Sequence, residues 1–296
     1  MFKTLIFTPL LALLPLLAWG KVEMKWFGVA SILLDDGKTQ IFFDPMFTRA
    51  DFKHIFNATF KSDEALVKRV MEENAFSKVQ AIFSSHSHFD HVVDAPILAK
   101  LTGGIFYTDP NSEIIAKAYK EPSIKTQLFV ENQRISVGKF TIIPILRDHA
   151  QIMHFFDFLP GKVKQDFNFG FWEYRVGDTW CFLVEHPEGR IFVDQGSNPW
   201  LEKVSQVVRS ADVVIQGVAN RKDDDAIIQG YVKSLKPKTF IPSHFDNFFT
   251  GFNDKGVSRL PRIRLEEVLD KLKLTYPGMS VVMPRFGQSI VLLEGK

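Results

Sequence analysis

Short apolar runs alternate with amphipathic stretches along most of the chain, which is typical of a mixed α/β fold. Apolar or β-branched runs predict strands, and apolar residues at helical spacing predict helices. Strands are expected over 22–27, 31–34, 40–43, 79–83, 105–107, 125–145 in three runs, 179–185, 190–193, 213–217, 239–242, 280–283 and 289–293. Helices are expected over 63–74, 92–101, 111–119, 201–209, 226–235 and 265–274. The similar order of elements in the two halves favours one compact domain over 21–296, with two packed mixed sheets flanked by helices.

The first residues predict a secretory signal peptide over 1–20. Lys3 provides the basic start, the apolar run 5–19 follows, and small residues precede an expected cleavage site before Lys21. A retained membrane anchor is the alternative, but the run is shorter than the ~20 residues of a spanning helix and contains two prolines. We therefore expect an exported protein, periplasmic or secreted, with no integral membrane span after cleavage.

Composition narrows the partners of the mature chain. Hydrophobic residues make up 46% of the sequence, enough for a large core, and the formal net charge is only +2. This balance provides no electrostatic attraction toward nucleic acid, so a small-molecule substrate is expected. The single cysteine, Cys181, excludes an intramolecular disulfide and lies within an expected strand, where a core position is favoured. Oligomeric state is not encoded in these features.

Three histidines and a carboxylate crowd the stretch that follows the expected strand 79–83. They are His86, His88, Asp90 and His91. On an extended segment side chains alternate in direction, so His86 and His88 point the same way and can share one cation. Asp90 and His91 come after the turn and can begin a second site. Imidazole with carboxylate suits zinc, with iron or manganese as alternatives.

Further candidate ligands also follow expected strands. His149 comes after the strand that ends at 145, Asp194 after 190–193, and His244 after 239–242. Asp44 closes the strand 40–43, where it could support a metal ligand or simply cap a turn. The remaining histidines lack such a position, and structural roles are expected for them (His54, His154 and His186).

The motif His86-x-His88-x-Asp90-His91 resembles the signature of the metallo-β-lactamase superfamily. The resemblance implies a four-layer αββα sandwich and a dinuclear metal centre. It implies that the first ion takes His86, His88 and His149, that the second takes Asp90, His91 and His244, and that Asp194 bridges them. Two further stretches, 25–28 and 41–45, are similar to the branch that contains ascorbate-phosphate lactonase and the N-acyl-phosphatidylethanolamine phospholipase D enzymes. That branch usually carries a histidine after the glycine, where this chain has Val29.

Two adjacent divalent cations predict hydrolytic chemistry. They can hold a bridging hydroxide at neutral pH, because coordination lowers the pKa of water from 15.7 to about 7. Asp90 is the expected catalytic residue, which would orient the hydroxide and carry a proton. No serine or cysteine nucleophile is then required, and no organic cofactor is expected.

The segment 151–172 is rich in aromatic residues and directly follows His149. A long loop in this position favours contact with a partly apolar substrate, although a satellite cluster of the core explains the composition equally well. We therefore predict an exported dinuclear zinc hydrolase, such as a lactonase, that acts on an ester, lactone or phosphodiester. The alternatives are a β-lactamase-like amidase and a non-catalytic protein that binds zinc or a ligand.

Overall fold

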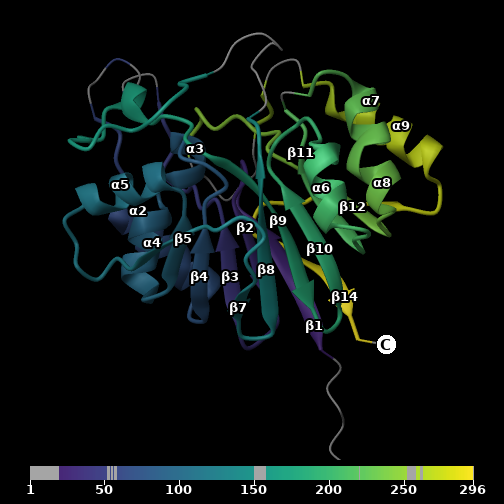
Figure 1. Cartoon of the computed structure of the whole chain (residues 1–296), viewed down its shortest axis with the longest axis horizontal. Coiled ribbons are helices and arrows are strands. Elements are labelled where there is room, and N and C mark those ends of the chain that lie inside the picture. The colour runs from purple at the N-terminus through teal and green to yellow at the C-terminus, as the bar shows by residue number, and fades with distance from the viewer. Residues whose placement is uncertain are drawn as a thin grey trace, which may run out of the picture.

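The computed structural model in Figure 1 describes residues 20–51, 54, 56, 59–149, 158–219, 221–251, 258–260 and 263–295. The predicted signal peptide and His154 therefore lie outside the described residues, apart from Gly20. Within the described part, no helix combines the length and the apolar character that crossing a membrane requires.

Two sheets form the centre of the molecule (Figure 1). The first has, from edge to edge, β14 (Ser289–Glu294), β1 (Lys21–Trp26), β2 (Ile32–Asp35), β3 (Gln40–Phe43), β4 (Val79–Phe83), β5 (Ile105–Thr108) and β6 (Thr126–Leu128). The second has β13 (Ser280–Val281), β12 (Thr239–Ser243), β11 (Val213–Gly217), β10 (Gly189–Asp194), β9 (Thr179–His186), β8 (Phe140–Arg147) and β7 (Ile135–Val137). Both sheets are mixed, as predicted.

Aromatic rings join the facing sides of the two sheets. Phe43 of β3 lies 5.1 Å, between ring centroids, from both Phe83 of β4 and Phe182 of β9. All three side chains are buried in one large hydrophobic cluster with residues of both sheets. Apolar residues on one side of each strand thus form the inner core, which explains the alternation in the sequence.

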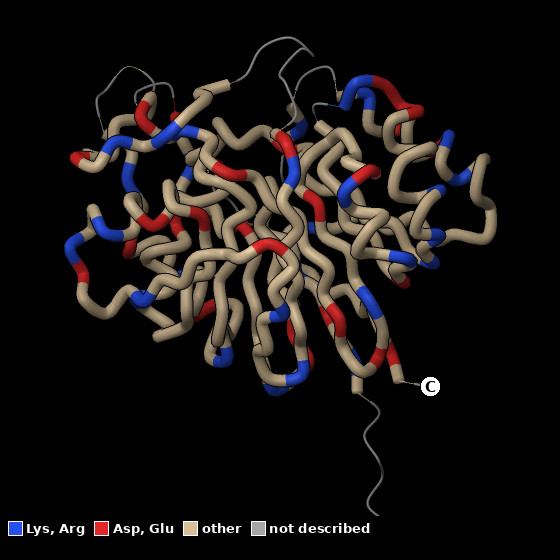
Figure 2. The backbone as a smooth tube through the Cα atoms, viewed as in Figure 1, with Lys and Arg blue, Asp and Glu red and all other residues tan. Residues whose placement is uncertain are grey.

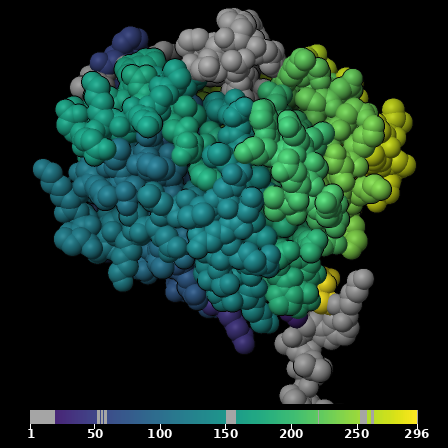
Figure 3. Space-filling view, viewed as in Figure 1, coloured from purple at the N-terminus to yellow at the C-terminus, as the bar shows by residue number. Residues whose placement is uncertain are grey.

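Helices cover the two outer faces and complete the four layers. On the first sheet lie α2 (Glu64–Asn74), α4 (Ala95–Thr102) and α5 (Pro110–Ala118), which share a second buried cluster with that sheet. On the second lie α6 (Leu201–Val207), α7 (Asp224–Ile227), α8 (Lys233–Leu235) and α9 (Leu265–Thr275) (Figure 1). Figure 3 shows the two halves of the chain side by side, blue to teal and green to yellow. The predicted αββα sandwich is confirmed.

Two predicted helices differ in detail. The expected helix 92–101 is preceded by a separate helical turn, α3 (Phe89–Val92), so Asp90 and His91 lie on helix rather than loop. The expected helix 226–235 is interrupted by a π-helical segment, η2 (Ile228–Val232), in which Gly230 departs from helical geometry. A Cβ atom at Gly230 would lie 2.3 Å from Pro199, so close packing explains the interruption. A further short helix, η1 (Phe171–Glu173), lies in the aromatic segment.

Strand direction gathers the candidate ligands at one edge. β10, β11 and β12 are parallel, and β8 runs the same way because both β8 and β10 are antiparallel to β9. The carboxyl ends of β8, β10 and β12 therefore meet beside the end of β4, since Trp180 of β9 donates its backbone N–H to Ser85 at 2.7 Å. The loops at this edge carry the predicted site.

Candidate metal centre

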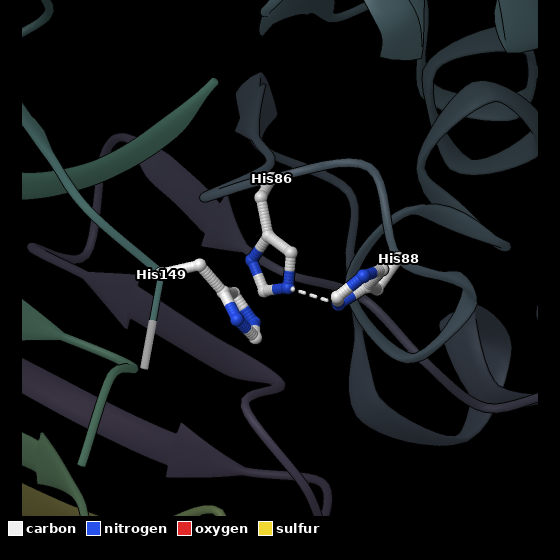
Figure 4. Close-up of side chains that lie close together, drawn as sticks. All are labelled: His86, His88 and His149. Atoms are coloured by element: carbon white, nitrogen blue, oxygen red, sulfur yellow. Dashed lines mark hydrogen bonds between the residues drawn. The ribbon is translucent and has the colours of Figure 1, made fainter. Parts of the chain in front are cut away.

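His86, His88 and His149 form the first ligand group. His86 and His88 follow β4, and His149 follows β8. One ligand atom from each residue lies within 4.8 Å of those of the other two. His86 Nε2 lies 3.0 Å from His88 Nδ1, and the ring of His149 is directed at this pair (Figure 4). Three imidazoles from two sheets thus converge on one point.

Asp90, His91 and His244 form the second group. Asp90 and His91 lie on α3, whereas His244 follows β12 in a left-handed backbone conformation (φ 53°). His244 Nε2 lies 3.2 Å from His91 Nε2 and 3.3 Å from Asp90 Oδ2, and the latter two atoms are 3.5 Å apart. The helical turn that starts at Phe89 places consecutive residues of the motif in this group.

These distances fit a divalent transition metal. Ligand atoms that bind zinc tetrahedrally at ~2.1 Å lie ~3.4 Å from one another. The second group has separations of 3.2–3.5 Å before any adjustment. Imidazole and carboxylate are also the donors that zinc, iron and manganese accept. Each group can therefore hold one ion.

Polar partners fix the far nitrogens of the ligand rings. His88 Nε2 lies 2.9 Å from the backbone oxygen of Phe158, and His91 Nδ1 lies 3.1 Å from Asp44 Oδ2. Ser85 Oγ lies 3.1 Å from Nδ1 of both His86 and His91. Such contacts set the tautomer and leave the other nitrogen for a metal. The sequence suggested Asp44 but not Ser85, which directly precedes the motif.

Electrostatics keeps four of the six candidate ligands in the form that binds a metal, namely three neutral histidines and the ionised Asp90. Burial lowers the pKa of His86 far below its usual value, that of His88 to about 4 and that of His149 to about 3, so these rings are neutral at pH 7. Burial would raise the pKa of Asp90, but His91 and His244 outweigh it, and the carboxyl pKa falls. Burial would lower the pKa of His91, but Asp90 and Asp44 outweigh it, and that pKa rises.

Asp194, the seventh predicted ligand, belongs to neither group. Its fully buried carboxylate accepts hydrogen bonds from the Arg147 guanidinium, from the Gly196 N–H at 2.8 Å and from the Tyr231 hydroxyl at 2.7 Å. Arg147 lines the cavity of the candidate ligands, whereas Asp194 does not. Arg147 was not among the predicted site residues, although a charged residue at the end of a buried strand is a visible signal.

All six clustered ligands line one cavity of about 440 Å³. Its other walls are largely apolar, from Phe89, Phe158, Ala219, Phe248, Phe249, Leu260 and Ile263. The described part of the aromatic segment lies in two places, because Phe158 lines this cavity while Phe167, Phe169 and Phe171 are buried in the helix-side core. A larger cavity of about 1030 Å³ adjoins it and shares Arg147, His149, Phe158 and Thr179.

The other described histidines have local partners away from the ligands. His186 lies 3.5 Å from Asp36, and His54 lies 2.8 Å from Asp51. Cys181 is buried within β9, so its predicted core position is confirmed. Acidic and basic residues are interspersed along the described chain (Figure 2), in keeping with the small net charge.

An αββα sandwich with two His/Asp groups at one sheet edge defines a class of metal-dependent enzymes, and comparison with known proteins identifies the family. Residues 39–246, more than half of the chain, match the family model described as "Beta-lactamase superfamily domain". The chain belongs to this superfamily and is a metal-dependent hydrolase.

Individual relatives agree with this assignment. A UPF0173 metal-dependent hydrolase of Anaeromyxobacter sp. (strain K) is 25% identical over 245 residues, which cover 79% of this chain and 78% of the relative. Igni18, a metallo hydrolase of Ignicoccus hospitalis, has a TM-score of 0.59 at 13% identity, covering 92% of this chain and 98% of that one. An isothiocyanate hydrolase from Delia radicum gut bacteria has a TM-score of 0.58 at 15% identity, covering 92% and 99%. Both solved structures share the fold of this chain.

Proposed function

We propose that the protein is an exported dinuclear hydrolase that cleaves an ester, lactone or phosphodiester bond in a small, partly apolar substrate. The observation that carries the proposal is that both ligand groups line one cavity whose remaining walls are largely apolar. A substrate held against these walls would present its scissile bond to the ligand groups. The similarity of 25–28 and 41–45 to the lactonase and phospholipase D branch supports the same bond types.

The ligand sets support one ion in each group, with zinc as the proposed metal and iron or manganese as alternatives. Divalent ions supply Lewis acidity and water activated near neutral pH. The chain's own contribution is to keep His86, His88 and His149 neutral and Asp90 ionised. It also orients the ligand rings through Asp44, Ser85 and the Phe158 carbonyl. These contacts reduce the reorganisation that metal binding needs.

Asp90 is the proposed catalytic residue. It carries the only carboxylate among the described residues that line the cavity, and its Oδ2 lies between His91 and His244. A carboxylate in this position can orient the attacking water and accept its proton. The lowered pKa keeps the carboxylate ionised, so that it can accept a hydrogen bond from the water and orient it.

Asp194 is proposed as the ligand shared by both groups, as the family resemblance implies. Because Arg147, Gly196 and Tyr231 donate to its carboxylate, this role requires at least the Arg147 contact to be exchanged for a metal. An Asp194→Asn variant tests it directly by elemental analysis. Loss of bound metal would support the shared-ligand role, and unchanged metal content would exclude it.

The main experiment measures metal content and turnover on the same purified samples. The panel contains an acyl lactone, an aryl ester, a phosphodiester and a cephalosporin, the last to test the amidase alternative. His88→Ala and His91→Ala should each lose about one metal per chain and at least about 100-fold in kcat/KM, because even partners behind the ligands contribute 10–100-fold. His186→Ala, a buried histidine outside the centre, is the matched control and should retain both.

Two results would contradict the proposal. Wild-type protein with two metals but no turnover above His88→Ala on any substrate would support the binding-protein alternative. Fewer than two metals in the wild type would exclude a dinuclear centre.

Export is proposed from the apolar run that precedes Lys21. Expression of the full chain followed by N-terminal sequencing tests it. A mature terminus at Lys21 in the exported fraction is expected, and an unprocessed chain in the membrane fraction would favour the retained anchor.

A further inference from the structure

The imidazole of His244 lacks the polar support that the other histidine of its group, His91, has. Nδ1 of His91 lies 3.1 Å from Asp44 Oδ2 and 3.1 Å from Ser85 Oγ. Nδ1 of His244 is buried and has no hydrogen-bond partner among the described residues. The ring of Phe248 packs against it at 5.9 Å between centroids, a contact without a directed hydrogen bond. The position of His244 in its group therefore depends mainly on its backbone.

That backbone is tied to the turn between β1 and β2. The His244 N–H donates to the Val29 carbonyl at 2.8 Å, and both residues have left-handed conformations, with φ of 53° and 48°. The Trp26 indole N–H donates to the same carbonyl at 2.9 Å. A left-handed conformation is unfavourable for a β-branched residue such as valine, and it persists only where neighbouring groups hold it in place. The turn therefore needs further contacts to keep the shape that His244 uses.

Asp246 and Arg49 provide these contacts. The Asp246 carboxylate accepts from the Val29 N–H at 2.5 Å and from the Arg49 guanidinium at 3.3 Å. Both side chains of this ion pair are buried, with exposures of 2% and 5%. Arg49 also donates to the Phe27 carbonyl at 3.2 Å. The pair packs directly on Gly28, where a Cβ atom would lie 2.2 Å from Arg49 Nη2 and 2.9 Å from Asp246 Oδ2, so it encloses the turn.

We propose that Asp246 and Arg49 are positioning residues for the second metal site, because they hold Val29 in the conformation that places His244 beside the other two ligands. This inference rests on the metal centre of the proposed function and adds two residues to it. Neither residue lines the cavity of the ligands, so neither is expected to touch the substrate. The pair acts on one ligand of one group, so its loss should weaken the second site and spare the first.

The test measures zinc affinity one site at a time, by competition with a chromophoric chelator. In protein carrying His88→Ala, only the second group is complete, and Asp246→Asn should weaken zinc binding about 10-fold, the lower end of the range for contacts behind metal ligands. In protein carrying His91→Ala, only the first group is complete, and Asp246→Asn should leave the affinity unchanged. Asp224→Asn is the matched control and should weaken neither site, because Asp224 forms a similarly buried pair with Arg221, with exposures of 6% and 5%, and belongs to neither group.

A second variant separates positioning from a general loss of structure. Glycine adopts the left-handed conformation without strain, so Val29→Gly added to Asp246→Asn should recover at least about 3-fold of the lost affinity. Val29→Ala is the control, because it removes the branched side chain but keeps the Cβ atom, and it should recover much less. Should Asp246→Asn fail to fold by circular dichroism, Arg49→Lys takes its place with the same selective loss expected, because it keeps a cation but not the planar guanidinium.

These affinities are measured without substrate, so the inference and the proposed function can fail separately. Equal weakening of the two sites, no weakening of the second, or equal recovery by Val29→Gly and Val29→Ala would overturn the inference. Any of these results together with two metals and turnover in the wild type would leave the hydrolase intact. Selective weakening with recovery by glycine alone, in a protein that hydrolyses no substrate of the panel, would support the positioning role and contradict the hydrolase.

Discussion

Arg147 and Asp194 form an ion pair beside the metal centre with side-chain exposures of 1% and 0%. Arg147 also donates to the carbonyls of Asp148 and Asn198, so it ties the end of β8 to the loop after β10. Asp194 in turn accepts from Tyr231, which follows α7. The pair therefore connects three segments that are distant in sequence, and its satisfied hydrogen bonds offset the cost of burying two charges.

Arg147→Met should destabilise the chelator-treated protein by about 3–5 kcal/mol, because it leaves the Asp194 carboxylate buried without its cation. Urea unfolding followed by circular dichroism measures the loss. Arg190→Met is the matched control, since Arg190 pairs with Glu185 at 3.3 Å with 46% and 22% exposure, and it should cost about 0–1 kcal/mol. Equal losses in the two variants would show that burial adds nothing to the Arg147 pair.

The clustering of six candidate ligands could be predicted from sequence, because the motif places four of them within a few residues and His149 and His244 follow strand ends. Their supporting contacts could not. Arg147 and Asp194 are 47 residues apart, and Asp44 at the end of β3 contacts His91 after the neighbouring strand β4. Such pairs depend on which strands become neighbours, and local pattern carries no information about that order.

At the scale of single elements, α2 and α5 both start at an aspartate cap, and the two caps differ in burial. Asp109 caps α5, where its carboxylate accepts from the backbone N–H groups of Asn111 and Ser112 at 3.1 and 3.0 Å. It is almost fully buried, and burial raises its pKa to about 6. Asp63 caps α2 in the same way but is exposed.

The buried cap predicts a pH-dependent stability. Between the usual carboxyl pKa of 3.8 and about 6, the folded chain holds the Asp109 proton more tightly than the unfolded chain does. Stability from this group is therefore present at low pH and is lost as pH rises through that window. Asp109→Asn removes the effect. The free energy of unfolding of the variant minus that of the wild type should therefore rise by about 2–3 kcal/mol from pH 4 to pH 7. Urea unfolding at both pH values measures it.

Asp63→Asn serves as the control for this experiment, because it changes a helix cap with the same chemistry at an exposed position. A difference between Asp109→Asn and the wild type that does not vary with pH would contradict the assignment.

Most elements could be predicted because apolar periodicity depends on local sequence. Among the exceptions, the turn α3 and the interruption at η2 have long-range causes. α3 starts at Phe89, whose ring packs at 4.6 Å on Phe171, and η2 bends where Gly230 meets Pro199. Neither partner is near in sequence, so helical spacing alone missed α3 and indicated a continuous helix over 226–235.

At the scale of the whole molecule, each ligand group takes residues from both sheets. His86, His88, Asp90 and His91 follow β4 of the first sheet, whereas His149 and His244 follow β8 and β12 of the second. The fold class and the approach of these loops were predictable, because strands of one direction end at one edge. The wall of the cavity was not predictable, since Phe248, Phe249 and Ile263 come from loops after β12 that have no recognisable sequence pattern.

A metal ion bound to either group would connect the two sheets, so it should stabilise the whole sandwich rather than one loop. With free zinc at about 1,000 times the Kd, each filled site should add about 4 kcal/mol to the free energy of unfolding. Urea unfolding of chelator-treated and zinc-loaded protein measures this gain. His244→Ala should lose the stabilisation that zinc in one site provides. His186→Ala should keep the full gain, because His186 lies outside both groups. If zinc leaves the unfolding midpoint unchanged, the ligand groups do not bind it selectively in the folded state, and the hydrophobic core between the sheets holds them together without it.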